Sequence, residues 1–348
     1  MHRASLPNPP APMSHVDYRA LRYLMGRSNG TERQKRKQIE KFDRAYRKGQ
    51  CSIPDVETQQ QKWWRCEARF LLGDYSSWAG WQYRSDHATS IWFRNPFQCP
   101  VWTGERVGRL AVIGEQGLGD EILFGSLLPE LKEKVGQVVL ETDERLRGVF
   151  ERSMKIATCA TLMKPYEDPD MGWKRTLQEP EADAWVSLAD LPRVYRHTDS
   201  DFPRKAYITP DPERVAQFAH LRGRIGISWR GRQGERKELI REFPNAISLQ
   251  YDQGWDEDVE RPDVDLKEDI EGVMGVLANL DRVVTVSTSV AHIASAMGVA
   301  TEVRLADLGT GQASQLIPWK WVNRKHPGET LWYPKTTKVI ESKDMRLW

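Results

Sequence analysis

One stretch of the chain combines a strand, a polar turn and a helix, and it reads Arg282-Val-Val-Thr-Val-Ser-Thr-Ser-Val-Ala-His-Ile-Ala-Ser-Ala-Met-Gly298. The β-branched run from Val283 to Val286 is typical of a buried strand. Residues 287–289 favour a helix N-terminus, and Gly298 favours the end of that helix. Because the first turn of a helix offers unpaired N–H groups and a positive dipole end, this pattern predicts an anion site. An ordinary capped helix would give the same local pattern.

Outward from this stretch, strand-like and helical runs alternate in two blocks. The first block contains a strand at 109–113, a glycine-rich loop, a helix at 121–131 and a strand at 137–141. Further strand candidates in the two blocks lie at 157–163, 184–188, 206–208, 224–229, 246–250 and 301–305, and a helix is expected at 269–280. This alternation predicts an α/β protein with two Rossmann-like domains, residues 101–210 and 211–330, that face each other across a cleft.

The glycine-rich loop of the first block reads Gly114-Glu-Gln-Gly-Leu-Gly-Asp120. It does not have the spacing of a dinucleotide fingerprint, and no P-loop lysine follows it. Gly117 and Gly119 would let the backbone approach a ligand closely. Asp120 is either the N-cap of the following helix or a general base in the cleft, with Glu115 as a second carboxylate.

Several cations follow Trp229 in the second block. Arg230 and Arg232 could form a solvated loop, or they could bind the oxygens of a diphosphate. His292 would ordinarily be a core histidine, but it lies within one turn of the proposed anion site. Neither the His nor the Cys residues show a metal-binding spacing, so the sequence predicts no metal site.

The first 100 residues differ in composition from the rest. We expect residues 1–14 to be a disordered tail, 15–100 a helical extension with one repeat-like unit, and 331–348 a segment that packs back on the first domain. Residues 1–100 contain 17 Lys and Arg against 9 Asp and Glu, although the net charge of the whole chain is only +2. A basic segment of this kind predicts either a solvated helix face or a nucleic-acid patch, formed by Arg33, Lys35, Arg36, Lys37, Lys41 and Arg44.

The chain shows no apolar run long enough to span a membrane and no secretory signal pattern, and its four cysteines are widely spaced. These features predict a cytoplasmic protein with reduced thiols.

Taken together, the motifs resemble glycosyltransferases of the heptosyltransferase-like group, which have the GT-B fold. The resemblance is strongest to the catalytic part of bacterial tetratricopeptide-repeat-linked glycosyltransferases, and it implies a bacterial cell or a phage-infected host. The matching segments are 71–84 with 100–104, Glu115–Asp120, 225–229 with 248–250, 280–298, and the aromatic motifs Trp319-Lys-Trp321 and Trp332-Tyr-Pro334.

This resemblance implies transfer of a sugar from a nucleotide diphosphate sugar to an acceptor hydroxyl, with inversion and without a metal ion or other cofactor. It implies that Asp120 is the base and that Thr288, Ser289 and His292 cradle the donor diphosphate. Ser287, Trp229, Arg230 and Arg232 are further candidate donor contacts. Two positions depart from the family pattern: Ser287 stands where an acidic residue is usual, and Arg230-Gly-Arg232 replaces a small turn that contains Asn.

Three functions stay open at this point. The acceptor is a glycan or lipid-linked sugar in the first. In the second, the basic N-terminal region binds DNA and the sugar is transferred to a hydroxymethylated pyrimidine base. The third is a non-catalytic protein that binds nucleotide sugars or acts as a scaffold, which the loss of the acidic residue at Ser287 would suggest.

Overall fold

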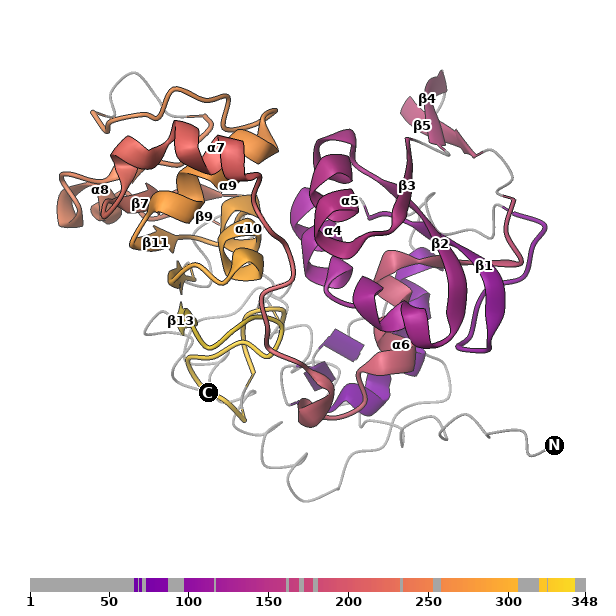
Figure 1. The fold of residues 1–348 in the computed structure, drawn as a ribbon. Coiled ribbons are helices and arrows are strands. Elements are labelled where there is room, and N and C mark those ends of the chain that lie inside the picture. Colours follow the sequence, from indigo (N-terminus) through magenta and orange to yellow (C-terminus); the bar gives the residue numbers. More distant parts are fainter. Residues whose placement is uncertain are drawn as a thin grey trace.

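The computed structural model describes residues 66–67, 69–70, 73–86, 97–115, 117–160, 163–168, 172–177, 181–231, 234–252, 258–305, 319–323 and 325–341. Within them the chain forms two α/β halves, and each half is built on its own parallel sheet (Figure 1). The predicted α/β class with two Rossmann-like halves is confirmed. A third group of residues, 66–67, 69–70 and 73–86, contributes helical turns from the N-terminal extension. The basic patch and the tail of residues 1–14 lie outside the described residues.

The sheet of the first half has the strand order β3-β2-β1-β6, with all neighbours parallel. The strands are β1 (Val107–Ile113), β2 (Val135–Thr142), β3 (Ala157–Ala160) and β6 (Ala184–Ser187), and β4 (Met163–Asp168) and β5 (Gly172–Leu177) form a separate antiparallel hairpin. The helices and 3-10 turns are α4 (Leu118–Gly125), η3 (Leu128–Glu133), η4 (Glu144–Leu146), α5 (Arg147–Met154), η5 (Leu188–Asp190), α6 (Pro192–Tyr195) and η6 (Asp199–Asp201).

Two expectations for this half need correction. The helix predicted at 121–131 begins earlier, at Leu118, and is interrupted after Gly125. A 3-10 turn with Pro129 near its start follows, because proline lacks the N–H group that an α-helix would need there. The segment 206–208 is not a strand: the N–H groups of Tyr207 and Ile208 both donate to the carbonyl of Ala296.

The sheet of the second half has five parallel strands in the order β10-β7-β11-β12-β13. They are β7 (Ile225–Ser228), β10 (Ile247–Ser248), β11 (Arg282–Thr285), β12 (Thr301–Arg304) and β13 (Thr337–Ile340). The other elements are η1 (Tyr75–Asp86) in the extension and, in this half, α7 (Pro212–Gln217), η7 (Ala219–Leu221), the small hairpin of β8 (Arg230–Gly231) and β9 (Gly234–Glu235), α8 (Glu238–Glu242), α9 (Ile270–Asn279) and α10 (Ser289–Met297).

Between β12 and β13 the chain crosses to the first half and returns. We call residues 319–333, of which 324 is not described, the C-terminal strap. Trp332 of the strap packs on Phe124 of α4 and on Phe202, and Trp319 packs on Phe70 and Trp81 of the extension. The strap therefore joins the extension and both halves.

The two halves also contact each other directly. Helix α4 of the first half packs against α10 of the second half (Figure 1). Arg152 of α5 forms a two-point ion pair with Glu271 of α9, with N–O distances of 2.8 and 2.6 Å. The packing of α4 on α10 and the Arg152–Glu271 ion pair hold the ends of α4 and α10 at fixed positions relative to each other.

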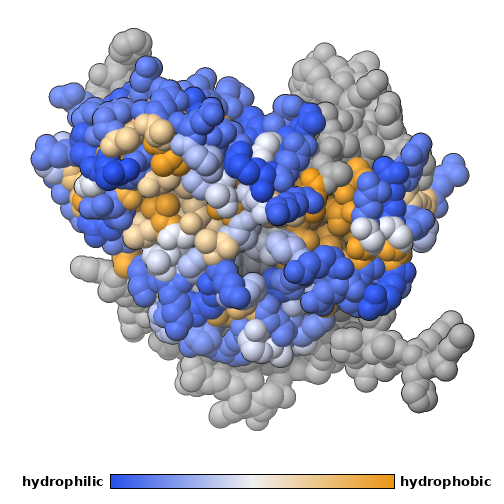
Figure 2. Space-filling model, viewed as in Figure 1, coloured by the Kyte–Doolittle hydropathy of each residue, from blue (hydrophilic) through white to orange (hydrophobic). Residues whose placement is uncertain are grey.

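Figure 2 shows a mostly hydrophilic outer face on which hydrophobic residues gather in one area on each half.

Candidate functional site

Asp120 lies in the first turn of α4, directly beyond the carboxyl end of β1. The N-cap position is taken by Gly117, with φ −132° and ψ 136°, and the N–H groups of Asp120 and Glu121 both donate to the Gly117 carbonyl. The prediction that Asp120 could be the N-cap is therefore wrong, because the helix begins one residue after Gly117. The Asp120 side chain is 38% exposed, so it remains accessible at the start of the helix.

The Asp120 carboxylate forms an ion pair with Lys320 of the C-terminal strap. The Lys320 ammonium group lies 5.8 Å from the centre of the Phe124 ring and 5.9 Å from that of Trp319. Cations placed near aromatic rings gain favourable interactions that fix their position. Lys320 was not among the residues predicted from the sequence, although it stands in the middle of the motif Trp319-Lys-Trp321.

Gly119 and His292 form the contact between α4 and α10. A β-carbon built on Gly119 would lie 2.7 Å from Cδ2 of His292, far inside the contact distance of two carbon atoms. Glycine at this position therefore lets the two helices approach, and it brings the predicted loop and the predicted anion site together.

His292 is buried, with 6% of its surface exposed. Its Nδ1 shares a hydrogen bond of 2.6 Å with the hydroxyl of Tyr333, and its ring lies 4.6 Å from that of Trp321. Burial, and to a lesser degree the charge of Lys320, lowers the pKa of His292 to about 3. The imidazole is therefore neutral at physiological pH, and it can offer a hydrogen bond to a ligand but no charge.

The side chain of the N-cap residue does not cap the N-terminus of α10. Thr288 is the N-cap residue, but its hydroxyl interacts with the hydroxyl of Thr285 at 3.2 Å and with the carbonyl of Val286 at 3.4 Å. Ser289 is the first residue of the helix. Because the Thr288 side chain does not satisfy the first-turn N–H groups, they are available to an anion.

Ser287 lies directly before this N-cap and accepts a hydrogen bond of 2.9 Å from the indole N–H of Trp321. Gly231, the last residue of β8, also lies close, because a β-carbon on it would be 2.9 Å from the Thr288 methyl group. The strap and strand β8 thus both approach residues 287–289, which the sequence predicted as donor contacts.

Two of the other predicted donor residues, Trp229 and Arg230, are described in the second half. The predicted donor contact of the Trp229 side chain is wrong, because that side chain is fully buried in the core beside Ile227 and Leu239. Arg230 lies 3.5 Å from Glu235 and donates to the carbonyl of Asp252 at 3.4 Å. Arg232 lies outside the described residues.

Glu115 holds the loop after β1 against the end of β6. Its Oε1 accepts hydrogen bonds from the Ser187 hydroxyl at 2.6 Å and from the N–H of Ala189 at 3.2 Å. This geometry favours a supporting role for Glu115 over the predicted role of a second reactive carboxylate.

Two further carboxyl groups are buried behind the loop. Glu121 accepts hydrogen bonds from the Thr142 hydroxyl and from the N–H of Asp143, and Glu141 accepts one from the N–H of Gly114 at 3.1 Å. Burial raises the pKa of Glu121 to about 8. At neutral pH Glu121 is therefore mostly protonated, and this avoids two buried charges side by side.

The N-terminal extension also contributes a carboxyl group to this region. Glu67 accepts a hydrogen bond of 3.2 Å from the Trp319 indole, and its burial raises its pKa to about 7 despite the nearby charge of Lys320. Sequence reasoning missed Glu67 because it is separated from Lys320 by more than 250 residues and belongs to no motif.

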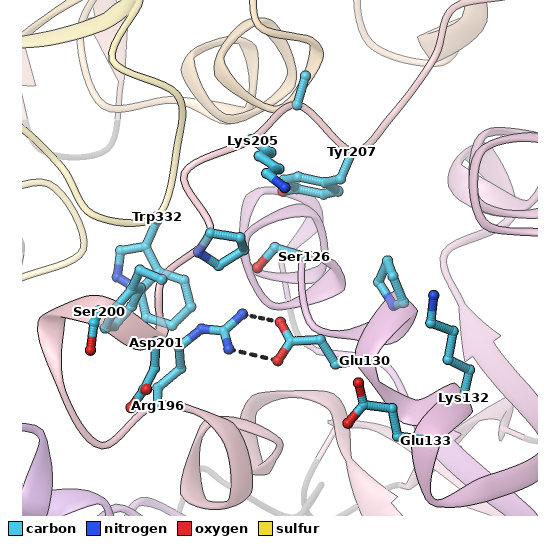
Figure 3. A pocket seen from close by; sticks show the side chains of 14 residues that line it. Ser126, Glu130, Lys132, Glu133, Arg196, Ser200, Asp201, Lys205, Tyr207 and Trp332 are labelled. Atoms are coloured by element: carbon cyan, nitrogen blue, oxygen red, sulfur yellow. Dashed lines mark hydrogen bonds and ion pairs between the residues drawn. The ribbon is translucent and has the colours of Figure 1, made fainter.

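A pocket of about 430 Å³ lies at the other end of α4, near the helix C-cap Ser126 (Figure 3). Arg196, which is 1% exposed, points at Glu130 there, and the two form a two-point ion pair with N–O distances of 2.9 and 2.5 Å. Tyr207 and Trp332 also line this pocket. Since Asp120 stands at the N-terminus of the same helix, the pocket is separate from the candidate site.

The described residues show no group of three or more His, Cys, Asp or Glu side chains that could hold a metal ion. Within the same residues, no helix is long and apolar enough to cross a lipid bilayer.

No protein-family model matches the chain. FlbA of Caulobacter vibrioides is 28% identical to it over 288 residues, covering 69% of this chain and 47% of FlbA. The chain thus spans about half the length of this curated relative.

Three solved structures are similar to the chain at 10–11% identity. ADP-heptose LPS heptosyltransferase II of E. coli covers 67% of this chain and 90% of its own, with a TM-score of 0.40. A family 9 glycosyltransferase of Veillonella parvula covers 70% and 88%, with a TM-score of 0.44. The iron-containing dodecameric glycosyltransferase TibC of enterotoxigenic E. coli covers 63% of each chain, with a TM-score of 0.40.

Proposed function

We propose that this protein is a glycosyltransferase that moves a sugar from a nucleotide diphosphate sugar to an acceptor hydroxyl. The proposal rests on one observation. Helix α4 packs on α10, and this packing brings the accessible carboxylate of Asp120 close to the N-terminus of α10, which the side chain of the N-cap residue Thr288 does not cap. A carboxylate that accepts a proton and a group that binds a diphosphate are the two parts that this reaction needs on opposite sides of the sugar.

In the proposed reaction, the acceptor oxygen forms a bond to the anomeric carbon of the donor sugar. The bond from that carbon to the diphosphate oxygen breaks, and its electron pair leaves with the nucleotide diphosphate. The acceptor proton goes to Asp120. Because this is a single displacement from the side opposite the leaving group, the anomeric configuration inverts.

The leaving group gains negative charge as the bond breaks. The N–H groups at the start of α10 and the hydroxyls of residues 287–289 would stabilise that charge through hydrogen bonds and the helix dipole. The proposal assigns no step to a metal ion.

For the acceptor we propose a glycan or a lipid-linked sugar. The alternative of modified DNA depends on Arg33, Lys35, Arg36, Lys37, Lys41 and Arg44, all of which lie outside the described residues. It stays a prediction from the sequence, and no contact of the described residues favours it.

A thermal-shift screen with UDP-, GDP-, CDP-, ADP- and dTDP-sugars tests the donor class, because a bound donor raises the apparent stability. Turnover is then measured as release of the nucleotide diphosphate. The Asp120→Asn variant should bind the same donor and lose at least about a hundredfold in turnover, the usual contribution of a general base.

Glu115→Gln serves as the matched control. The carboxyl group of Glu115 lies in the same loop as Asp120, but it accepts hydrogen bonds from Ser187 and Ala189. It should retain most of the activity if the loop keeps its shape. Binding of a nucleotide sugar without any turnover in the wild type would favour the non-catalytic alternative, and full activity of Asp120→Asn would rule out Asp120 as the base.

A further inference from the structure

Lys320 is placed between the two parts of the proposed reaction. Its ammonium group pairs with Asp120, at the start of α4 in the first half. The next residue, Trp321, donates a hydrogen bond to Ser287, directly before the N-terminus of α10 in the second half. Lys320 also acts electrostatically on His292, one turn into α10. A single cation therefore lies near both the candidate base and the candidate diphosphate site.

Two of the described cations that follow β7 have other partners. Arg230 interacts with Glu235 and with the Asp252 carbonyl. Arg236 interacts with Glu238 and donates to the Leu305 carbonyl. Lys320 instead pairs with Asp120 at the start of α4, the helix that packs on α10, and the four-carbon stem of a lysine lets its ammonium group change partners.

We propose that Lys320 is a cation shared between two partners: it pairs with Asp120 when no donor is bound, and it binds the diphosphate when the donor is present. The inference rests on the proposed function and deepens it, since it assigns the donor contact to the strap. A diphosphate carries more negative charge than a carboxylate and offers more acceptor oxygens, so it competes effectively for the ammonium group.

This sharing would couple donor binding to the reactivity of Asp120. While Lys320 holds the carboxylate, Asp120 is a poor proton acceptor, because accepting a proton would break the ion pair. Movement of Lys320 to the diphosphate frees the carboxylate at the moment when a sugar is in place. Donor binding would therefore precede activation of the acceptor.

The test is titration calorimetry with UDP, GDP, CDP, ADP and dTDP on the full chain. Lys320→Met keeps most of the side-chain length and removes the charge. We expect it to weaken binding of the nucleotide that the wild type prefers by about tenfold or more, as for loss of a charge-assisted hydrogen bond. The corresponding nucleoside, which lacks the diphosphate, should not change in affinity if its binding is measurable.

Lys325→Met is the matched control. Lys325 lies on the same strap, but its ammonium group donates to the Gly73 carbonyl at 2.8 Å, away from Asp120. We expect nucleotide affinity to remain within about twofold of the wild type. A loss as large as that of Lys320→Met would mean that the strap, and not the Lys320 charge, is responsible, and it would overturn the inference.

Asp120→Asn tests whether the cation is shared. Because this variant removes the competing carboxylate, it should bind the nucleotide several-fold more tightly than the wild type. The double variant Asp120→Asn/Lys320→Met should bind as weakly as Lys320→Met alone. Unchanged affinity in Asp120→Asn would overturn the sharing.

The outcomes separate this inference from the proposed function. If the wild type binds a nucleotide and Lys320→Met binds it equally well, Lys320 is not the donor cation, and the proposed function still stands. If the wild type binds none of the five nucleotides or their sugars, the proposed function fails and the inference fails with it.

Discussion

The imidazole ring of His292 lies against the α-carbon of Gly119, leaving no room for a side chain between α4 and α10. A β-carbon at residue 119 would come within 2.7 Å of the ring, whereas one at Gly117 would meet only an Asp120 oxygen, at 3.6 Å. We therefore expect Gly119→Ala to push the two helices apart and to lower the melting temperature by several degrees, with loss of activity. Gly117→Ala is the control, since the extended backbone at Gly117 suits any residue. Equal melting temperatures of the two variants would contradict this account of the interface.

The buried carboxyl group of Glu121 should make stability fall with rising pH. Its pKa is raised from 4.5 to about 8 by burial, so the folded state holds the proton more tightly than the unfolded state. The contribution is complete below about pH 4.5 and is lost as the pH rises towards 8, for a total of a few kcal/mol.

Urea unfolding of the wild type and of Glu121→Gln at several pH values from 5 to 9 would measure this effect. The amide cannot ionise, so the variant should show a smaller decrease in the free energy of unfolding over this range. Glu67 contributes in the same direction, because its pKa is raised to about 7. His292 acts in the opposite direction between pH 5 and 6.5, because burial lowers its pKa to about 3, so only the difference between the wild type and Glu121→Gln isolates Glu121. An equal pH dependence in the two proteins would contradict the prediction.

The hydroxyl of Tyr333 satisfies Nδ1 of the buried His292. Tyr333→Phe would leave that nitrogen without its partner, and we expect it to cost about 1–3 kcal/mol of stability. Tyr195→Phe is a suitable control, because the Tyr195 hydroxyl makes only a long contact of 3.4 Å with the Glu130 carbonyl. Denaturant titration of the two variants should show a clear decrease for the first and less than about 0.5 kcal/mol for the second.

In the ion pair of Arg196 and Glu130, the arginine side chain is buried and the glutamate side chain is partly exposed. Arg196 is 1% exposed and Glu130 is 32% exposed, so Glu130→Ala would leave a buried cation without its carboxylate. We expect a loss of about 3 kcal/mol, the lower end of the range for such pairs. Glu133→Ala, at the edge of the same pocket, should change stability far less. Urea unfolding of both variants tests this, and equal effects would show that the pair does not stabilise the fold.

The strand–turn–helix unit at 282–298 could be predicted almost to the residue. Its signals are local: a β-branched strand, an N-cap threonine and Gly298, which adopts φ 81° where a side chain would be strained. The strand β13 could not be predicted in the same way. It is four residues long, and it is fixed by pairing with β12, more than 30 residues earlier in the chain.

In the candidate site too, the residues set by local sequence could be predicted and those set by distant contacts could not. The glycine loop and Asp120 could be found because they follow a clear strand. Lys320 and Glu67 could not, because their positions depend on the path of the strap between β12 and β13. A local pattern also could not decide whether Asp120 was the N-cap, since Gly117 can take the extended conformation of that position without a capping side chain.

The aromatic contacts of the strap have a consequence for the order of folding. Phe70, Trp78 and Trp81 lie early in the chain, yet Trp319 and Trp332 cover them, with Phe70 and Trp319 ring centres only 4.9 Å apart. Phe70, Trp78 and Trp81 also pack on one another, but during synthesis Trp319 joins them only after about 250 further residues have left the ribosome. The aromatic cluster of the extension therefore reaches its final packing only after four strands of the second sheet have been synthesised.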